Sequence, residues 1–438
     1  MLKLKKVLEY LLYLFVFLLP LQTRFIYQEF LIKGQPFEYG RLSIYATEIL
    51  FALILILGLC LLLIRILKTK PRLSFKESKT RLILLIVGLA LLAANILLAA
   101  NSELSFYKAT QIILAFCFFF LLLIIKPDFK RLSWAFIYSA LIQGVLALQQ
   151  FTAQKVVANK WLGMASQDPT VLGTPVVLTN AGRWLRSFGG LPHPNFLAGF
   201  LVVALILILF LSLREENKKS KRNLSLSFVI IFLALLTTLS KAAILCAVII
   251  FILALFVTRR ENEQNKKISR LAIVALAVLV FFTVSYPALI FNRVTNANAV
   301  EQRSYSERVS QYGEWAQVMK SNLFFGTGLG NYTLDLQKIK PNLESWDYQP
   351  MHNTFLLIVA EIGIIPLLYI VGLCIYYGRK KKWELSIYCL PVLAMILLML
   401  VDHYWWSFYS GLLLVGFVFG FQFLEPRQAP TAKKLSKN

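Results

Sequence analysis

Charged residues are scarce in this chain. Asp, Glu, Lys and Arg make up only 16% of its 438 residues, whereas soluble proteins carry about a quarter. The acidic residues are the scarcer kind, at 22 against 46 Lys and Arg, and histidine occurs three times. Apolar residues account for 58% of the sequence. This composition excludes an ordinary soluble protein and predicts a polytopic membrane protein, so the net charge of +24 does not indicate a nucleic-acid partner.

Cysteine is also rare, and a signal-peptide cleavage site is lacking. All five cysteines lie inside apolar runs, which excludes a disulfide framework and a cysteine metal cluster and predicts small core residues. The basic start and first apolar run are not followed by a small-residue cleavage site before Gln22, so we expect a retained helix. With no fixed-period repeat and no soluble segment, residues 1–438 are expected to form a single integral membrane domain.

Apolar runs of about 17 to 25 residues predict a bundle of twelve transmembrane helices. They cover residues 6–22, 43–66, 82–100, 106–125, 132–152, 195–213, 224–239, 241–258, 270–290, 352–377, 385–402 and 407–424. If the N-terminus is inside, the inner segments hold 31 of the 46 Lys and Arg residues, although the outer loops are much longer. We therefore expect an all-α membrane protein with both termini in the cytoplasm.

Basic residues flank the long apolar run 224–258 on both sides, so it must fold back on itself. The turn is expected at Ser240-Lys241, where Ser240 would cap the returning helix.

Two outer loops, 153–194 and 291–351, are far longer than a connection requires, and such loops are usually functional. Five apolar residues in the second loop recur at helical spacing, which predicts an amphipathic helix along the membrane surface. They are Val309, Tyr312, Ala316, Met319 and Leu323. The glycine run 326–330 follows this helix and lacks a P-loop lysine, so it is interpreted as a turn rather than a nucleotide site.

The sixth, eighth and tenth predicted spans all begin on the outer side, and a polar motif precedes each one. The motifs are residues 186–195, Ser240-Lys241 and Met351-His352-Asn353. Helix N-termini carry unpaired N–H groups that bind anions. Together with the cations of Arg186, Lys241 and Arg308, they predict a site for a phosphorylated group. His352 is expected in the first helical turn, where the helix dipole would keep its ring neutral, as a base requires.

Some of these residues have a structural explanation as well. Lys241 could simply extend to the membrane interface. His403 lies beside Tyr404, Trp405 and Trp406, and we interpret this group as an interfacial aromatic belt. Pro192, Pro194 and Asn195 could be only a helix start.

Glu361 follows His352 by nine residues, half a turn out of phase on a straight helix. A carboxylate at this depth is costly, so we expect it to be protonated or paired with a neighbouring helix. Structural support and orientation of an acceptor both stay open as its role.

The polar motifs resemble the bacterial O-antigen ligase and O-antigen polymerase superfamily of integral membrane glycosyltransferases. Four segments carry the resemblance: 186–198, 236–241, 307–332 and 352–363. The first five predicted spans match only in being hydrophobic. One departure is Lys241, where the family commonly has arginine; lysine keeps the charge but loses the bidentate fork.

The resemblance implies transfer from a polyprenyl pyrophosphate-linked glycan to a glycan, lipid or protein acceptor. The reaction would take place at the outer face of the bacterial cytoplasmic membrane, among membrane lipids, without metal or nucleotide cofactor. His352 is implied as the general base, with Arg186 and Arg308 as catalytic pyrophosphate ligands. Further substrate contacts are expected from Lys241, His193, Asn195, Asn353 and Glu361.

Three other functions stay open at this point, one of which is a scaffold for other assembly enzymes. Polymerisation of lipid-linked repeat units is an alternative to ligation within the same family. A transporter of lipid-linked saccharides or anions is an alternative of another class, although such folds usually show internal symmetry.

Overall fold

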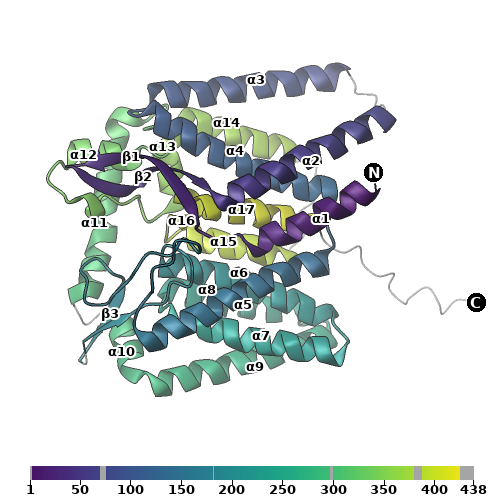
Figure 1. Cartoon of the computed structure of the whole chain (residues 1–438), viewed down its shortest axis with the longest axis vertical. Helices are drawn as coiled ribbons and strands as arrows, with labels where there is room; N and C mark the ends of the chain where they lie inside the picture. The colour runs from purple at the N-terminus through teal and green to yellow at the C-terminus, as the bar shows by residue number, and fades with distance from the viewer. Residues whose placement is uncertain (1, 70–74, 181, 296–298, 379–386, 425–438) are drawn as a thin grey trace, which may run out of the picture.

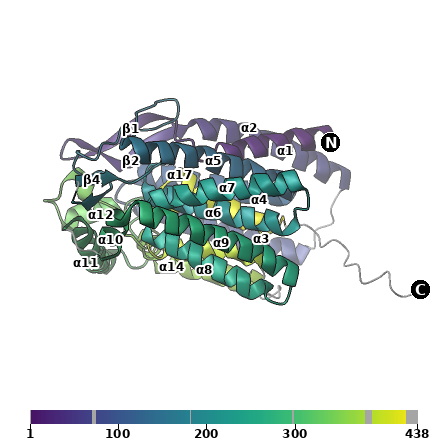
Figure 2. The same cartoon turned by 90° about the horizontal axis from the view of Figure 1, so that it is seen from below.

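The structure is a computed structural model, and it describes residues 2–69, 75–180, 182–295, 299–378 and 387–424. The basic segment 379–382, the C-terminal residues and part of the basic segment 65–81 lie outside the described residues. The long helices run side by side, and two β-hairpins and helices α11 and α12 gather at one end of the bundle (Figures 1 and 2). We refer to this end as the loop end.

Eight helices in the described part of the chain are long and apolar enough to cross a membrane. They are α2 (Ala46–Thr69), α3 (Phe75–Leu98), α4 (Ser102–Ile125), α5 (Phe129–Ala153), α6 (Pro194–Arg214), α7 (Lys218–Thr237), α8 (Lys241–Thr258) and α9 (Asn262–Ser285). These eight match eight of the twelve predicted spans. The prediction of an all-α polytopic membrane protein is therefore confirmed.

The other four predicted spans are shorter or bent. Helices α1 (Leu2–Phe17), α15 (Leu390–Met399) and α17 (Tyr409–Phe421) contain 16, 10 and 13 residues. The predicted span 352–377 consists of α13 (Thr354–Ile362) and α14 (Ile364–Gly378), bent by 116°. If this bent pair counts as one span, the described residues hold up to nine. The expectation of one straight helix was wrong, because the chain breaks at Gly363.

The bend at Gly363 is held by the predicted glycine turn. Gly326 and Gly363 both have a positive φ, of 74° and 77°, which favours glycine. A side-chain carbon on Gly363 would collide with the backbone of Gly326, and one on Gly326 would collide with the Glu361 carbonyl. The turn after α11 is therefore confirmed, and it packs directly against the end of α13.

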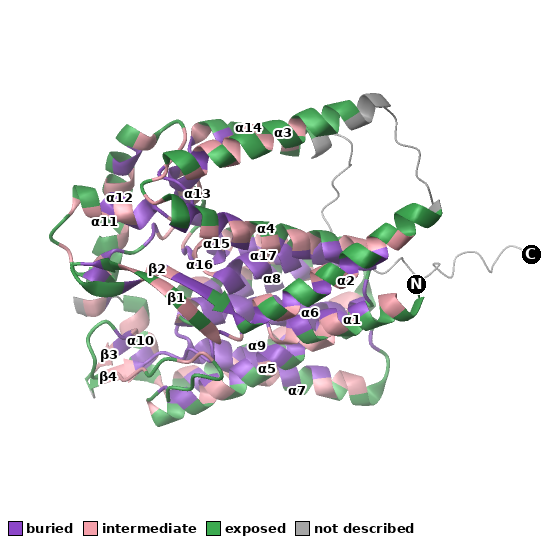
Figure 3. Ribbon diagram, turned by 45° about the horizontal axis from the view of Figure 1, so that its top comes forward, coloured by how far each residue is buried: buried purple, intermediate pink, exposed green. Residues whose placement is uncertain are grey.

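Helix α6 lies at the centre of the bundle. In the most apolar 18-residue stretch of α6, 89% of the residues are buried, whereas the corresponding share in α3 is 6%. Phe200 on α6 stacks on Phe136 of α5 with ring centroids 4.4 Å apart, and Phe136 stacks on Phe417 of α17 at 4.9 Å. A helix that is apolar all round is buried, whereas the exposed apolar residues of α3 suit a lipid-facing helix (Figure 3).

The loop end holds two antiparallel hairpins that the sequence analysis missed. One is β1 (Arg24–Ile32) with β2 (Gln35–Tyr45), and the other is β3 (Val176–Thr179) with β4 (Gly182–Leu185). In the first hairpin, Lys33 and Gly34 form the turn, and both have positive φ. Burial alternates along β1, so period-two patterning and a Lys-Gly turn were the signals that could have identified it.

Helix α11 (Ala299–Asn322) crosses the loop end between α10 (Pro287–Thr295) and α12 (Tyr332–Ile339), as Figure 1 shows. A helix is therefore present in the predicted segment, and its position along the membrane surface stays a prediction. Its predicted apolar stripe packs on the protein only in part, because Met319 is buried whereas Val309 and Tyr312 are more than half exposed. Gln311 and Val318, which lie outside the predicted stripe, are buried as well.

Candidate active site

Distant segments of the chain meet around Asp402, in the connection between α15 and α16 (Tyr404–Ser407). Possible ligand atoms of Asp402, His403 and His352 lie within 4.8 Å of one another, and the two imidazole centroids are 5.2 Å apart. The amide of Asn195 donates to the Asp402 carboxylate at 2.7 Å. The loop before α6, the start of α13 and the end of α15 thus contribute to one site.

His352 was expected in the first turn of a helix. In the structure it lies just before α13. Helix α13 begins at Thr354, and Asn353 is its N-cap. The Asn353 side chain accepts hydrogen bonds from the N–H groups of Phe355 and Leu356, both at 3.1 Å. These N–H groups are therefore satisfied within the protein, so the predicted anion site on this helix end was wrong. Asn353 acts as a cap, which fixes the chain direction at His352.

Gln311 of α11 fixes the tautomer of His352. The backbone N–H of His352 donates to Gln311 Oε1 at 3.0 Å, and ring atom Nδ1 lies 3.0 Å from the same oxygen. Because this oxygen can only accept, Nδ1 must carry the proton. The second ring nitrogen, Nε2, then holds a lone pair.

The environment keeps the imidazole rings neutral. Burial lowers the pKa of His352 below its usual value; the negative charge of Asp402 opposes this shift, and Arg308 adds to it. Burial also lowers the pKa of His193 and of His403 to about 3. The pKa of Asp402 is lowered, because the neighbouring histidines and Arg308 outweigh the effect of burial. The site therefore combines an ionised carboxylate with neutral imidazoles.

His403 is part of this cluster and not of an interfacial aromatic belt. His403, Tyr404 and Trp405 are all buried, and Trp405 is fully inaccessible. His403 Nδ1 lies 3.0 Å from the hydroxyl of Ser407, one helical turn later. The interpretation as an aromatic belt was wrong. Aromatic residues next to a polar segment are found at helix ends that pack inside a protein as well as at helix ends that face lipid.

Arg186 reaches the cluster through Asn195. Its guanidinium is buried and donates to the Thr238 carbonyl at 2.8 Å and to Asn195 Oδ1 at 2.5 Å. Asn195 in turn donates to Asp402. Arg186 thus orients Asn195 and crosslinks the loop before α6 to the turn after α7. His193 has a local role in addition, since its Nδ1 accepts from the Asn195 N–H at 3.1 Å and caps α6.

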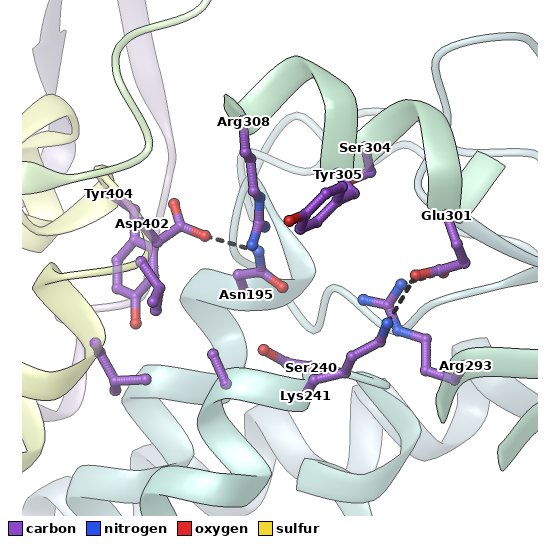
Figure 4. A pocket seen from close by; sticks show the side chains of 13 residues that line it. Asn195, Ser240, Lys241, Arg293, Glu301, Ser304, Tyr305, Arg308, Asp402 and Tyr404 are labelled. Carbon is purple, nitrogen blue, oxygen red and sulfur yellow. Dashed lines mark hydrogen bonds and ion pairs between the residues drawn. The ribbon is translucent and has the colours of Figure 1, made fainter. Parts of the chain in front are cut away.

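A cavity of about 260 Å³ opens beside Asp402 and Asn195. We call it the cationic cavity, because Lys241, Arg293 and Arg308 line it (Figure 4). Its remaining lining residues are Ser240, Ala242, Glu301, Ser304, Tyr305, Leu398, Val401 and Tyr404. Arg308 projects from α11 toward Asn195, as Figure 4 shows. Among the described residues Arg308 has no hydrogen-bond or ion-pair partner.

Glu301 joins the other two cations of this cavity. Its buried carboxylate lies 3.1 Å from Lys241 Nζ and forms an ion pair with Arg293. Although burial raises the pKa of Glu301, Arg293 and Lys241 lower it overall. The predicted turn at Ser240-Lys241 is confirmed, although Ser240 gives α8 no side-chain cap. Lys241 contributes to the cavity wall and does not merely extend to the surface.

Glu361 is held inside the protein near the end of α13. Its carboxylate accepts from Trp406 Nε1 at 2.6 Å and interacts with Lys108 of α4. Lys108 Nζ donates to the Ser407 carbonyl at 2.8 Å. Of the two expectations for this carboxylate, pairing with neighbouring helices is the one that these contacts support. Since both α4 and α16 hold it, Glu361 stabilises the position of α13.

Four contributors were missed from the sequence: Asp402, Gln311, Arg293 and Glu301. An acidic residue at the end of an apolar run, directly before a histidine, was a detectable signal for Asp402. Gln311 lies one residue before the predicted stripe residue Tyr312, and Arg293 and Glu301 belong to a polar loop. Nothing in the local sequence distinguishes these three from surface residues.

The donor set of His352, Asp402 and His403 would suit a divalent metal such as zinc by chemistry alone. Arg308 interacts electrostatically with all three residues, and Arg186 interacts with Asp402. These positive charges favour an anion over a further cation. The expectation of a metal-free site stays a prediction.

Comparison with known protein families gives a match over the middle of the chain. Residues 226–371 match the family model described as O-antigen ligase. This region runs from α7 into α14 and includes Lys241, Arg308, His352 and Glu361. Arg186, Asp402 and His403 lie outside it. No curated protein matches the chain.

Proposed function

The chain belongs to the O-antigen ligase superfamily through the domain at residues 226–371, and from this premise we propose a specific reaction. The protein transfers a glycan from a polyprenyl pyrophosphate carrier to an acceptor hydroxyl at the outer face of the bacterial cytoplasmic membrane. One observation carries the proposal: a neutral histidine with a free lone pair stands beside a cavity lined by Arg308, Arg293 and Lys241.

The pyrophosphate of the donor binds in the cationic cavity. Arg308 supplies a planar fork of N–H donors that matches phosphate oxygens, and Lys241 and Arg293 add positive charge. These donors stabilise the negative charge that grows on the departing pyrophosphate. Arg186 contributes indirectly, since it holds Asn195 against Asp402.

His352 removes the proton from the acceptor hydroxyl through Nε2. Gln311 keeps the proton of the ring on Nδ1, so Nε2 is free to accept. Asp402 lies close enough to stabilise the imidazolium that forms, because its negative charge raises the pKa of His352.

The bonds balance without a cofactor. The bond between the anomeric carbon of the glycan and the pyrophosphate oxygen breaks, and the electron pair leaves with the polyprenyl pyrophosphate. The acceptor oxygen forms the new bond to the anomeric carbon, and its proton goes to His352. The donor is already activated, so neither metal nor nucleotide is required. Transfer by the purified protein should therefore persist in excess EDTA; loss of transfer that zinc or magnesium restores would contradict metal independence.

The central test is His352→Ala in purified full-length protein with extracted lipid-linked glycan. Transfer should fall by about 10² to 10⁴, the usual contribution of a general base, while the protein still accumulates in the membrane. Added imidazole should restore part of the activity, because it supplies the missing base in solution. Normal transfer by the alanine variant would refute the assignment.

Ligation and polymerisation differ in the product that a deletion strain accumulates. Full-length glycan on the carrier lipid indicates a ligase, whereas single repeat units indicate a polymerase. The ligase is the form we propose, since the matched family model is described as O-antigen ligase.

A further inference from the structure

A second cavity lies on the other side of the segment that contains α16. We call it the hairpin cavity, because Arg24, Glu38, Tyr39, Arg41 and Tyr45 of the β1–β2 hairpin form part of its wall. Residues of α4, α12, α13 and the segment 407–409 complete it. In Figure 1 these elements lie above α16, whereas α8 and α10, which border the cationic cavity, lie below it. Residues 402–409 thus separate the two cavities.

The cations of the hairpin cavity are already paired within the protein. Arg24 lies 2.7 Å from Glu38, and Arg41 lies 2.8 Å from both Glu38 and Glu29. Lys108 is buried, donates to a backbone carbonyl and lies beside Glu361. No arginine on this wall has the free guanidinium that Arg308 has, so an anion would gain little here.

Uncharged polar groups line the same cavity. The hydroxyl groups of Tyr332 and Thr333 are buried and have no hydrogen-bond partner among the described residues. Gln111 of α4 adds a buried amide to the wall. Unpaired buried hydroxyl groups are costly in a native protein and commonly mark a place where a ligand or water completes them. Together with the rings of Tyr39 and Phe408, they form the mixture of aromatic and polar groups that is typical of a small-molecule site.

The hairpin cavity adjoins the candidate base. His403 contacts Tyr39 and Phe408, at centroid distances of 5.7 Å and 6.3 Å, and it also contacts His352 at 5.2 Å. Pro350 lines the cavity and precedes His352 by two residues. A ligand in this cavity would therefore approach His352 from the side away from the cationic cavity.

We propose that the hairpin cavity is the acceptor subsite, and that it binds a neutral, hydroxyl-rich carbohydrate. This inference rests on the proposed function, because it assigns the second substrate of the same reaction. A volume of about 50 Å³ accommodates a hydroxymethyl arm or one hydroxyl-bearing edge, since a cavity needs about 10 to 15 Å³ on this measure to hold one water molecule. The rest of the sugar lies toward the open side, and the reacting hydroxyl extends to His352.

Two substitutions test the subsite without removing a hydrogen bond from the protein: Tyr332→Phe and Thr333→Val. If the hydroxyl groups have only a structural role, both variants should be as stable as the parent or more so, because an unpaired polar group is removed. If they bind acceptor, the KM for acceptor should rise about five- to tenfold, the loss expected for one hydrogen bond. The acceptor probe is the glycolipid fraction from a host strain that lacks the protein.

Release of free polyprenyl pyrophosphate by hydrolysis is measured in parallel, because water needs no carbohydrate subsite. The inference predicts that both variants keep the donor KM, the hydrolysis rate and the melting temperature of the parent. Ser139→Ala is the matched control, since Ser139 also has a buried, unpaired hydroxyl but lies on α5 outside both cavities. It should change none of these quantities.

An unchanged KM for acceptor in both variants would overturn the inference, and so would a parallel loss of donor hydrolysis. Mass spectrometry of the product gives an independent outcome: a glycan joined to a sugar hydroxyl supports the carbohydrate assignment, and one joined to a protein side chain overturns it. Failure of the proposed function looks different, because the parent protein itself would then release no polyprenyl pyrophosphate.

Discussion

The two cavities on either side of residues 402–409 contain the same kinds of charged residue in different states of pairing. In the cationic cavity, Lys241 and Arg293 share the single carboxylate of Glu301, and Arg308 has no partner among the described residues. In the hairpin cavity, by contrast, Arg24 and Arg41 each bind at least one carboxylate. Whether the cations are paired therefore says more about the ligand of a cavity than the number of its charges. An unpaired guanidinium suits a phosphate, and a paired one leaves room for neutral hydroxyl groups.

The largest expected effect comes from the unpaired arginine. Arg308→Ala should lower both transfer and donor hydrolysis by about 10² to 10³, because both reactions need the charge on the leaving pyrophosphate to be stabilised. Arg308→Lys should recover part of the loss, since it keeps the charge and loses the fork. Rates of both reactions are measured with saturating donor. If Arg308→Ala impairs transfer and spares hydrolysis, the arginine belongs to the acceptor side and the comparison fails.

The next effect concerns Asp402, which borders the cationic cavity and also contacts the histidines. Asp402→Asn should lower transfer by about tenfold to a hundredfold, the range for one charge-assisted hydrogen bond. The carboxylate raises the pKa of His352, so removing it lowers that pKa further. The base then stays neutral to lower pH, and the acid limb of the pH–rate profile should move to lower pH. A shift to higher pH would show that a group other than His352 controls this limb.

A smaller effect is expected from Glu301, which forms ion pairs with Lys241 and Arg293 in the same cavity as Arg308. Glu301→Gln removes the competing carboxylate, so the KM for donor should fall by up to about fivefold, the scale of a partly exposed ion pair. Titration of donor at fixed acceptor measures this change. The KM for acceptor should not respond. A rise in the donor KM would mean that Glu301 holds Lys241 and Arg293 in the binding geometry.

The smallest effect is the response to salt. Raising the ionic strength shortens the screening length and weakens attraction between an anionic donor and the cationic cavity. The KM for donor should therefore rise about two- to threefold between 0.05 and 0.3 M salt. The KM for acceptor should stay level, because the hairpin cavity is expected to bind a neutral ligand. Equal salt dependence of both constants would remove the distinction between the cavities.

Much of this architecture could be predicted from hydropathy and charge. Eight of the predicted spans correspond to long apolar helices, and the fold-back at Ser240-Lys241 followed from its basic flanks. The association of Arg186 with His352 followed from the polar motifs that precede the sixth and tenth predicted spans, and the resemblance to the family added Arg308. Both kinds of inference use averages over many residues, which is why they are robust.

Features that depend on tertiary contact could not be predicted. The tenth span breaks at Gly363 because the glycine turn packs against it, and apolar periodicity continues across the break. Gln311 belongs to the site because α11 packs beside His352. A single glutamine on a polar helix gives no local signal of that contact. The same limit applies to Arg186, whose guanidinium contacts Asn195 and not the cavity.

The close approach of Gly326 and Gly363 also limits how the sequence can change. The space that a side chain at either position would need is already filled by backbone at or beside the other. A larger residue at one position would require the chain at the other to withdraw first. We therefore expect related sequences either to keep both glycines or to lose them together, along with the tight connection between these two segments.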